Sequence, residues 1–214
     1  MLVSRTEAEL EQVATEIESE GGRASIRPCD VTDPGGVDEL FRRIKNVDVL
    51  VNSAGCNIPE PFLDVTDGNL ELLLATNLKS VVYTSQGAVR LALEARHDLA
   101  IVNISSQMGH VGAPNRSVYC ATKHAVEGLT KALAVELAPK GIRVNCVAPT
   151  FVDTPLTRPF FENDTFRRDV LASIPIGRIA TVGDVVGAVL FVASQAAALV
   201  TGTSIIVDGG WTAR

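Results

Sequence analysis

The sequence predicts an α/β protein with a doubly wound parallel sheet in a single domain. Short apolar runs with strand character alternate along the chain with amphipathic segments of helix length. The run Val47 to Val51 is almost continuously apolar, as expected for a parallel strand that is covered on both faces. The chain has 214 residues, 46% hydrophobic and 21% charged, which fits one globular domain with a sizeable core.

The first half of the chain is expected to open with a helix after a short strand. Thr6-Glu7-Ala8-Glu9 matches a capping box, and Gly21-Gly22 stands where this helix should end. Gly35-Gly36 fits a turn that enters a second helix at about residues 37–44. The further expected elements are strands Ala24 to Cys29 and Val47 to Val51 and one long helix from about Gly68 to Glu94.

The second half repeats the alternation of strand and helix. The expected elements are strand Ala100 to Ile104, helix Val118 to Ala138, strand Ile142 to Val147, helix Val182 to Ala193 and strand Ser204 to Val207. Side chains that follow parallel strands meet at one edge of the sheet, where such proteins place their sites. A site is therefore expected from Asp30, Asn52, Ser105-Ser106 and Pro149, each of which follows a strand.

Tyr119 and Lys123 form the clearest chemical pattern in the chain. They are four residues apart on a predicted helix, so the lysine ammonium can lie beside a phenol that ordinarily keeps its proton up to about pH 10. A phenol with a lowered pKa can act as acid and base near neutrality, and the Ser106 hydroxyl could hold the reacting oxygen. The alternative is a lysine that snorkels beside a half-buried ring and has no catalytic role.

Seven segments support the catalytic interpretation when they are taken together. They are Asp30-Val31-Thr32-Asp33, Asn52-Ser53-Ala54-Gly55, Asn77 in Thr-Asn-Leu, Asn103-Ile104-Ser105-Ser106, Tyr119 to Lys123, Arg143 to Pro149 and Val207-Asp208-Gly209-Gly210. In this order, and over the whole chain, they resemble the short-chain dehydrogenase/reductase family. The resemblance implies a Rossmann-like fold, a substrate lid over residues 150–178 within the single domain 1–214, and interconversion of a ketone and a secondary alcohol with a nicotinamide cofactor.

The resemblance also implies a role for each matching residue. Tyr119 is implied as the acid/base, Lys123 as the group that lowers its pKa and holds the nicotinamide ribose, Ser106 as the group that orients the carbonyl, and Asn77 as the support of a proton relay through water. Cofactor contacts are implied for Tyr119 and Lys123 and for Ser4, Arg5, Asp30, Val31, Asn52, Ala54, Gly55, Pro149, Val152 and Thr154.

Several of these residues have structural alternatives. Asp30 is either an adenine contact or a helix-entry aspartate before Pro34, and Asn52 either borders the cofactor or ties neighbouring strands. Thr154 either holds the carboxamide or caps a helix. Thr150 stands where the family usually has glycine, so its side chain is expected to crowd the nicotinamide.

Ser4-Arg5, at the end of the first strand, bears on the choice of cofactor. Family members that prefer NAD place an acidic residue here for the ribose hydroxyls, whereas a serine followed by an arginine suits the 2′-phosphate of NADP. NADP is therefore expected, with NAD as the alternative. The other interpretation is that Arg5 is an ordinary exposed side chain.

The family pattern begins before the first residue of this sequence. Its first strand, glycine-rich turn and helix, which receive the cofactor pyrophosphate, have no counterpart here, so an N-terminally incomplete fold is expected. In the family that strand lies between those represented here by Met1 to Ser4 and Val47 to Val51. The alternative to an active enzyme is thus a catalytically inactive remnant or a partner subunit that cannot hold the cofactor.

Composition limits the partners and the compartment. The net charge is −6 and the pI about 5.1, which argues against nucleic acid or an anionic membrane as a partner. The chain has no apolar run of about 18 residues, no secretory signal and no Cys-x-x-Cys pair, so a cytoplasmic protein with reduced thiols is expected. The histidines lack metal-ligand spacing. The helices 68–94 and 118–138 are implied by the resemblance to pair in a homodimer or homotetramer.

The residues between the catalytic serine and tyrosine bear on the substrate. Either they line a pocket for a polar substrate such as a sugar, polyol or keto acid, or they form a solvated loop; they include Gln107, His110, Asn115 and Arg116. In the lid, Phe160, Phe161 and Phe166 are expected to form its core.

Overall fold

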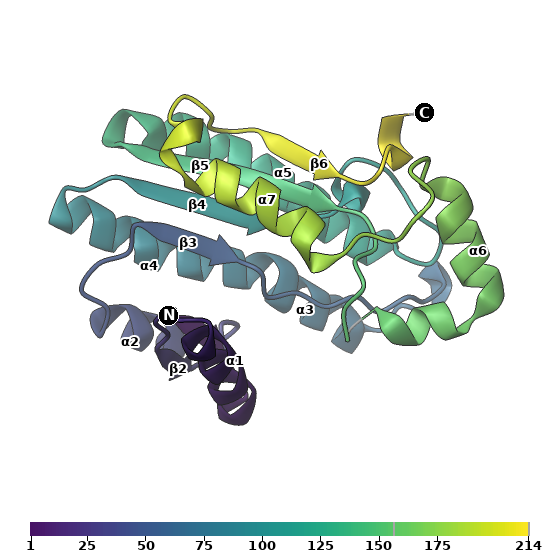
Figure 1. The fold of residues 1–214 in the computed structure, drawn as a ribbon, viewed down its shortest axis with the longest axis horizontal. Coiled ribbons are helices and arrows are strands. Elements are labelled where there is room, and N and C mark those ends of the chain that lie inside the picture. The colour runs from purple at the N-terminus through teal and green to yellow at the C-terminus, as the bar shows by residue number, and fades with distance from the viewer. Residues whose placement is uncertain (156, 214) are drawn as a thin grey trace.

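The computed structural model describes residues 1–155 and 157–213, which alternate between strands and helices (Figure 1). The strands are β1 (Leu2–Ser4), β2 (Ile26–Pro28), β3 (Val49–Asn52), β4 (Leu99–Ile104), β5 (Ile142–Pro149) and β6 (Ser204–Val207). The α-helices are α1 (Glu7–Ser19), α2 (Pro34–Arg42), α3 (Asp67–Leu74), α4 (Ser80–Ala95), α5 (Ser117–Leu137), α6 (Asp164–Ser173) and α7 (Val182–Ala193).

All strand pairs are parallel, and the strands form two sheets. β1 pairs with β2, while β3, β4, β5 and β6 form a four-stranded sheet in that order. β4 and β5 are buried along nearly their whole length, as parallel strands with helices on both faces should be. The prediction of a doubly wound α/β fold is confirmed.

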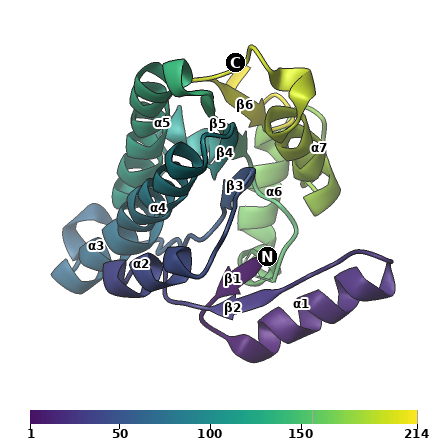
Figure 2. The ribbon, with the colours of Figure 1, turned by 90° about the vertical axis from the view of Figure 1, so that its left-hand side faces the viewer.

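Helices cover both faces of the four-stranded sheet. α2, α4 and α5 lie on one face, and α7 lies on the other (Figure 2). On the first face, Phe41 of α2 and Ala88 of α4 share a core with Ile101 of β4. On the second face, Val147 of β5 packs with Val192 of α7. This packing holds the carboxyl ends of the strands at one edge, where the candidate site lies.

A groove separates β1 from β3. It has a volume of about 530 Å³ and is lined by side chains of both strands and of α2 and α4. Val3 is 36% exposed, and Val49 and Val51 are each 42% exposed. Among the described residues, β1 and β3 each have one edge without a partner strand. The apolar run Val47 to Val51, predicted as a buried strand, is therefore only partly covered.

One local prediction is wrong. Thr6 is the N-cap of α1, but its side chain makes no capping hydrogen bond; Glu7 and Glu9 instead favour the helix start through its dipole. The expected helix from Gly68 to Glu94 forms as one continuous run, in which α3 and α4 are joined by a π-helical turn, Ala75–Lys79. Such a turn contains an extra residue and often marks a functional position.

The segment after β5 forms α6 and packs through aromatic side chains. The ring of Phe151 lies edge-on to Phe161 at 5.9 Å and to Phe166 at 5.5 Å between centroids. Phe160 and Phe166 are also neighbours, at 6.3 Å. The prediction that these phenylalanines form the core of the segment is confirmed, although Phe160 also lines the cavity described below.

Candidate active site

The predicted site residues collect at the carboxyl edge of the four-stranded sheet. Asn52 ends β3, Ser106 follows β4, and Pro149 ends β5. Tyr119 lies in the first turn of α5, and it lines a cavity of about 130 Å³ together with Ser106. The serine and the tyrosine, thirteen residues apart in the chain, thus face one small space.

The hydroxyl of Tyr119 interacts with that of Ser106 at the cavity, and this interaction favours ionisation of the phenol. Ser106 Oγ itself accepts the Met108 N–H at 3.1 Å. Burial raises the pKa of Tyr119 above its ordinary value, and the bond to Ser106 partly offsets this effect. The predicted lowering of the Tyr119 pKa by Lys123 is therefore not seen in this structure.

Lys123 is directed at the main chain. Its Nζ donates to the Ile104 carbonyl at 2.9 Å and lies 5.7 Å from the centre of the Tyr119 ring. Only 6% of the residue is exposed. Burial lowers the pKa of Lys123 to about 8, against the weaker opposing effects of Cys146, Cys56 and Glu127. The lowered pKa of Lys123 means that its buried surroundings disfavour the charged ammonium.

Removal of this charge is expected to stabilise the fold. Lys123→Met should raise the free energy of unfolding at pH 7 by up to about 3 kcal/mol, less about 1 kcal/mol for the lost bond to Ile104. Between pH 8 and 10.5 the unfolded wild-type chain keeps the lysine proton that the folded chain has lost, so wild-type stability rises relative to the variant. The advantage of the variant should vanish by about pH 10.5. Urea unfolding at a series of pH values measures the difference.

The matched control is Lys131→Met, because Lys131 is an exposed lysine on the same helix. This change should leave the difference in stability flat across the same pH range. A Lys123→Met variant that is less stable than the wild type at pH 7, or whose advantage does not shrink with pH, would contradict the description of a desolvated ammonium.

Asn77 links three parts of the site. It lies in the π-helical turn and is 1% exposed. Its Oδ1 accepts the Cys56 N–H at 2.8 Å, and its Nδ2 donates to the Cys56 carbonyl at 2.9 Å and to Thr122 Oγ1 at 3.2 Å. Asn77 thereby holds the segment after β3 against α5. Its participation in a proton relay stays a prediction.

Asn52 ties neighbouring elements, which was one of its two predicted roles. Its Nδ2 donates to Asn103 Oδ1 at 2.8 Å and to Ser85 Oγ at 3.2 Å, and its Oδ1 accepts from Thr84 Oγ1 at 2.7 Å. The amide is thus fully engaged between β3, β4 and α4. A cofactor contact of Asn52 stays a prediction.

The residues predicted for the adenine end lie beside one another. Hydrogen bonds from the hydroxyl and the backbone N–H of Thr32 lower the pKa of Asp30. The positive charge of Arg5 acts on Asp30 in the same direction. The alternative role of Asp30 as the helix-entry aspartate is wrong, because Asp33 caps α2. Ser4 and Val31 are partly buried, and Arg5 is exposed. The structure leaves Arg5 accessible to an anion.

The glycine pair Gly35-Gly36 is not available to a phosphate. The N–H groups of both glycines donate to the Asp33 carboxylate, at 3.1 and 3.0 Å. A carboxylate already occupies this helix start and would repel a second anion. Both glycine N–H groups are therefore engaged at the start of α2, which agrees with the predicted role of the pair as a helix-entry turn.

At the nicotinamide end the residues present fit the cofactor. A Cβ at Gly55 would lie 3.3 Å from Asn77 Oδ1 and 3.8 Å from Lys123 Nζ, so the glycine keeps the approach to the ammonium open. Ala54 is small and exposed beside it. On the opposite side, Val152 and Thr154 are joined through Thr157, whose hydroxyl bonds the Val152 carbonyl and lies 3.1 Å from Thr154 Oγ1. Contacts from these residues to a nicotinamide stay predictions.

The cavity beside Tyr119 has polar walls without protein partners. Three buried atoms among its lining residues make no hydrogen bond, namely Asn57 Oδ1, Gln107 Nε2 and Thr150 Oγ1. Gln107 is 1% and Thr150 7% exposed. Buried polar groups without a partner are costly, so they indicate a place where a ligand or water completes the bonding. Thr150 therefore brings a hydrogen-bonding group to the cavity as well as bulk.

The other residues between the serine and the tyrosine have different surroundings. Arg116 is buried and lies over the rings of Phe151 and Phe166, at 5.9 and 5.6 Å. Asn115 is exposed with φ at +58°. His110 turns away from the cavity towards Ser204 and Glu127. Of the four residues considered for the pocket, Gln107 alone lines it.

Sequence reasoning missed two polar residues. Asn57 lines the cavity, and Glu127 is buried four residues after Lys123. The spacing of Tyr119, Lys123 and Glu127 was a usable signal, because residues four apart share a helix face. Asn57 lies in an irregular segment, where no periodicity marks the direction of a side chain.

The described part of the chain has neither a helix suited to span a membrane nor a cluster of metal-binding side chains. None of its helices combines the length and the hydropathy that a membrane span requires. Within residues 1–155 and 157–213, no group of three or more His, Cys, Asp or Glu side chains is arranged to hold a metal.

A parallel α/β sheet with a serine, a tyrosine and a lysine at its carboxyl edge defines an oxidoreductase class, and comparisons with known proteins identify the family. A family model described as Enoyl-(Acyl carrier protein) reductase matches residues 1–212. L-xylulose reductase of Bos taurus is 37% identical over 211 residues, which are 99% of this chain and 85% of that protein. The 3-oxoacyl-[acyl-carrier-protein] reductase of Chlamydia pneumoniae is 35% identical over 90% of this chain and 78% of its own.

One solved structure has nearly the same fold as this chain. Gluconate 5-dehydrogenase from Burkholderia cenocepacia, in complex with NADP and tartrate, superposes with a TM-score of 0.93 at 30% identity. The match covers 100% of this chain and 85% of that one. The chain belongs to the short-chain dehydrogenase/reductase family, as its sequence motifs predicted.

Proposed function

We propose that this protein is an NADP-dependent oxidoreductase that interconverts a ketone and a secondary alcohol on a small, hydroxylated substrate. The observation that carries the proposal is the contact between the Ser106 and Tyr119 hydroxyls at a cavity next to the buried ammonium of Lys123. The family supplies the reaction class, and relatives include a xylulose reductase and an acyl-carrier-protein reductase.

Each catalytic side chain has a role that follows from its position. Bound nicotinamide supplies or accepts the hydride at the carbonyl carbon. Tyr119 gives a proton to the carbonyl oxygen or removes it from the alcohol. Ser106, already bonded to the phenol, donates to the same oxygen and aligns it. Lys123 keeps a positive charge near the phenol, which favours release of its proton.

NADP is the proposed cofactor. A structural relative with a TM-score of 0.93 was solved with NADP. In this chain Arg5 is exposed at the end of β1, where a guanidinium would meet the 2′-phosphate in a charge-assisted bond. Asp30 and Val31 border the adenine, and Lys123, Pro149, Val152 and Thr154 hold the nicotinamide half. Residues 150–178 form the lid over the substrate.

The substrate class follows from the polar walls of the cavity. Gln107, Thr150 and Asn57 present two acceptor oxygens and an amide donor that lack partners. A substrate with hydroxyl groups flanking the ketone, such as a keto sugar or a sugar acid, satisfies these atoms, whereas an alkyl ketone leaves them unpaired.

The test is NADPH consumption with a panel of keto sugars, simple ketones and 3-oxoacyl thioesters. Gln107→Leu is expected to raise KM for the preferred hydroxylated ketone about 10- to 100-fold and to leave that for a simple alkyl ketone nearly unchanged. Gln86→Leu, at an exposed position of α4, is the matched control. A preference for alkyl ketones, or equal effects on both substrates, would contradict the proposed substrate class.

A second candidate is a catalytically inactive partner subunit. It is favoured by one observation: the described residues offer no free glycine-rich helix start for the pyrophosphate, since Asp33 occupies that of α2. Titration of the chain with NADPH, followed by nicotinamide fluorescence, separates the two candidates, because the inactive subunit would show no binding at millimolar cofactor.

We also propose that the protein is a homodimer or homotetramer. Apolar side chains remain exposed on the two helices predicted to pair, among them Val135 of α5 at 81% and Leu93 of α4 at 40%. Such groups gain about 25 cal/mol for each Å² that a second copy covers. Light scattering at micromolar concentration is expected to give a mass of two or four chains, and a monomer would contradict the proposal.

The cytoplasm is the proposed compartment. All four cysteines are free thiols in the structure, and burial raises the pKa of Cys146 to about 12, which keeps it protonated. Unpaired buried thiols suit a reducing environment. Fractionation of cells that express the tagged protein tests the assignment.

A further inference from the structure

A buried carboxylate behind the catalytic lysine has no role in the mechanism described so far. Glu127 lies four residues after Lys123 and eight after Tyr119 on α5, so the three side chains follow one face of the helix. Glu127 is only 5% exposed. A carboxylate is rarely buried unless charged or polar partners surround it.

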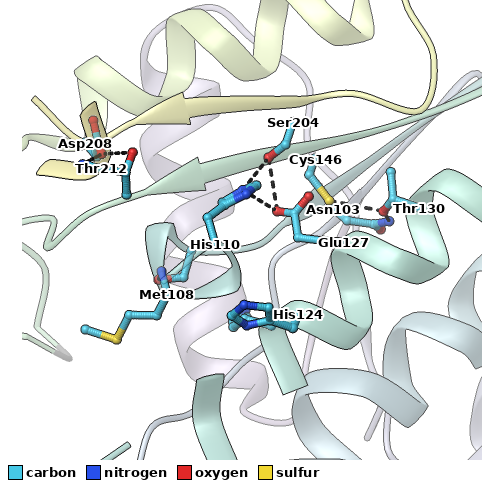
Figure 3. A network of polar contacts seen from close by, with 12 residues as sticks. Asn103, Met108, His110, His124, Glu127, Thr130, Cys146, Ser204, Asp208 and Thr212 are labelled. Atoms are coloured by element: carbon cyan, nitrogen blue, oxygen red, sulfur yellow. Dashed lines mark hydrogen bonds and ion pairs between the residues drawn. The ribbon is translucent and has the colours of Figure 1, made fainter. Parts of the chain in front are cut away.

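The partners of Glu127 come from two other elements (Figure 3). Ser204 of β6 donates its hydroxyl to Glu127 Oε1 at 3.0 Å. His110 Nε2 lies 3.2 Å from the same oxygen and 3.2 Å from Ser204 Oγ. The carboxylate thus joins α5, β6 and the residue that follows the short helical turn Gln107–Gly109.

That short turn is the one that Ser106 begins. Ser106 Oγ accepts the Met108 N–H, and the Ser106 carbonyl accepts the Gly109 N–H at 2.8 Å. A Cβ at Gly109 would lie 2.8 Å from Ser105 Oγ, 3.1 Å from Glu127 Cγ and 3.1 Å from the Lys123 carbonyl. The turn is therefore packed tightly on α5 beside Lys123 and Glu127, and His110 fastens its far end.

The carboxylate also acts on the charge of Lys123. Titratable groups around Lys123 come from two elements and one irregular segment. They are Tyr119 and Glu127 of α5, Cys146 of β5, and Cys56 in the segment after β3. The negative charge of Glu127 raises the pKa of Lys123 against the lowering by burial. The Cys146 thiol, which lies 3.1 Å from Thr130 Oγ1, is also acted on by the Glu127 carboxylate, so the carboxylate is near both the thiol and the lysine.

The Ser204–His110–Glu127 group is not arranged for nucleophilic catalysis. His110 Nε2 faces both the serine and the carboxylate, whereas a catalytic triad needs the serine at one ring nitrogen and the carboxylate at the other. The group is better understood as an anchor for the elements that it joins.

We propose that Glu127 is a positioning residue for the reaction: through His110 it holds the Ser106 turn against α5, and through its charge it supports the ammonium of Lys123. The inference rests on the proposed function. Glu127 does not line the cavity beside Tyr119, so its loss affects the alignment and charge of the groups that do.

The central experiment compares Glu127→Gln with the wild type. The amide still accepts from Ser204 but carries no charge. We expect kcat to fall about 10- to 100-fold with KM little changed, because the misplaced groups act mainly in the transition state. The basic limb of the pH profile of kcat should move to lower pH, since Lys123 loses its proton more readily without the anion. Glu136→Gln, at an exposed glutamate of α5, is the matched control and should behave as the wild type.

A second variant separates the two effects. His110→Ala releases the turn but keeps the carboxylate, so kcat should fall while the basic limb stays at the wild-type pH. Unchanged kcat in both variants, or an unmoved basic limb in Glu127→Gln, would overturn the proposal.

A third measurement does not require turnover. NMR titration of selectively labelled lysine side chains should show a lower pKa for Lys123 in Glu127→Gln than in the wild type. A wild type that reduces no ketone would refute the proposed function, while a Lys123 titration unchanged by the substitution would refute the role of Glu127. Melting curves of each variant identify any that is unfolded. Ser204→Ala, which also loosens the anchor but keeps the carboxylate, replaces an unfolded His110→Ala, and Glu127→Met, which also removes the charge, replaces an unfolded Glu127→Gln, each with the directions expected for the variant that it replaces.

Discussion

The Tyr119→Phe variant is expected to reduce ketones about 10² to 10⁴ times more slowly than the wild type, the usual contribution of general acid–base catalysis. The change removes the phenolic proton at the cavity that Tyr119 and Ser106 both line, and it keeps the aromatic ring. NADPH affinity and melting temperature should stay close to wild-type values. The measurement is kcat at saturating NADPH, in a form of the protein shown by fluorescence titration to bind that cofactor.

The chain supplies its own control for this change. Tyr83, the other of its two tyrosines, lies on α4, packs against the core and does not line the cavity. Tyr83→Phe should retain nearly full turnover. Comparable turnover in Tyr119→Phe and the wild type would remove Tyr119 from the mechanism, while equal losses in both variants would point to a general effect on folding.

Fusion of a strand, a glycine-rich turn and a helix before Met1 is expected to raise the melting temperature of residues 1–214, to lower their binding of a hydrophobic dye and to strengthen their binding of NADPH. The groove between β1 and β3 leaves two strand edges unpaired among the described residues, with Val3, Val49 and Val51 partly exposed. Covering these valines contributes about 2 to 4 kcal/mol, apart from the backbone bonds formed with both edges. Calorimetry, binding of a hydrophobic dye and NADPH titration measure the three changes.

A second fusion separates folding from cofactor binding. With the glycines of the added turn replaced by alanine, the fused chain should melt cooperatively but bind NADPH poorly, because a Cβ prevents close approach of the backbone to the pyrophosphate. If the 214 residues alone melt in one sharp transition and bind no dye, the prediction that the uncovered groove lowers the stability of the fold is wrong.

The strands and the placement of Tyr119 and Lys123 on one helix face were predictable because each depends on a local pattern. Val182–Ala193 and Ser204–Val207 have the bounds that periodicity predicted. Tyr119 and Lys123 share a face of α5 because 3.6 residues make one helical turn. The π-helical turn at Asn77 was not predicted, because the spacing of apolar residues there is that of a continuous α-helix. The turn is recognised only in the structure, where Asn77 bonds Cys56 and Thr122.

The pKa of Tyr119 was predicted in the wrong direction for the structure described here. Spacing on a helix places a cation near the phenol, but it does not show that the ammonium bonds the Ile104 carbonyl or that burial dominates both groups. Desolvation depends on every element that covers a side chain, and those elements come from distant parts of the chain.

By itself the sequence determined the family and the order of strands and helices, and it predicted the residues proposed to react, because these follow from motifs and from periodicities of two and 3.6. Only the tertiary structure decided which polar groups are left without partners beside Tyr119 and that Asn52 ties strands. It also decided that Glu127 is buried between His110 and Ser204. Asn52 meets Asn103, which is 51 residues away, and Glu127 meets Ser204, which is 77 residues away. No local pattern encodes such contacts, because the packing of whole layers brings these side chains together.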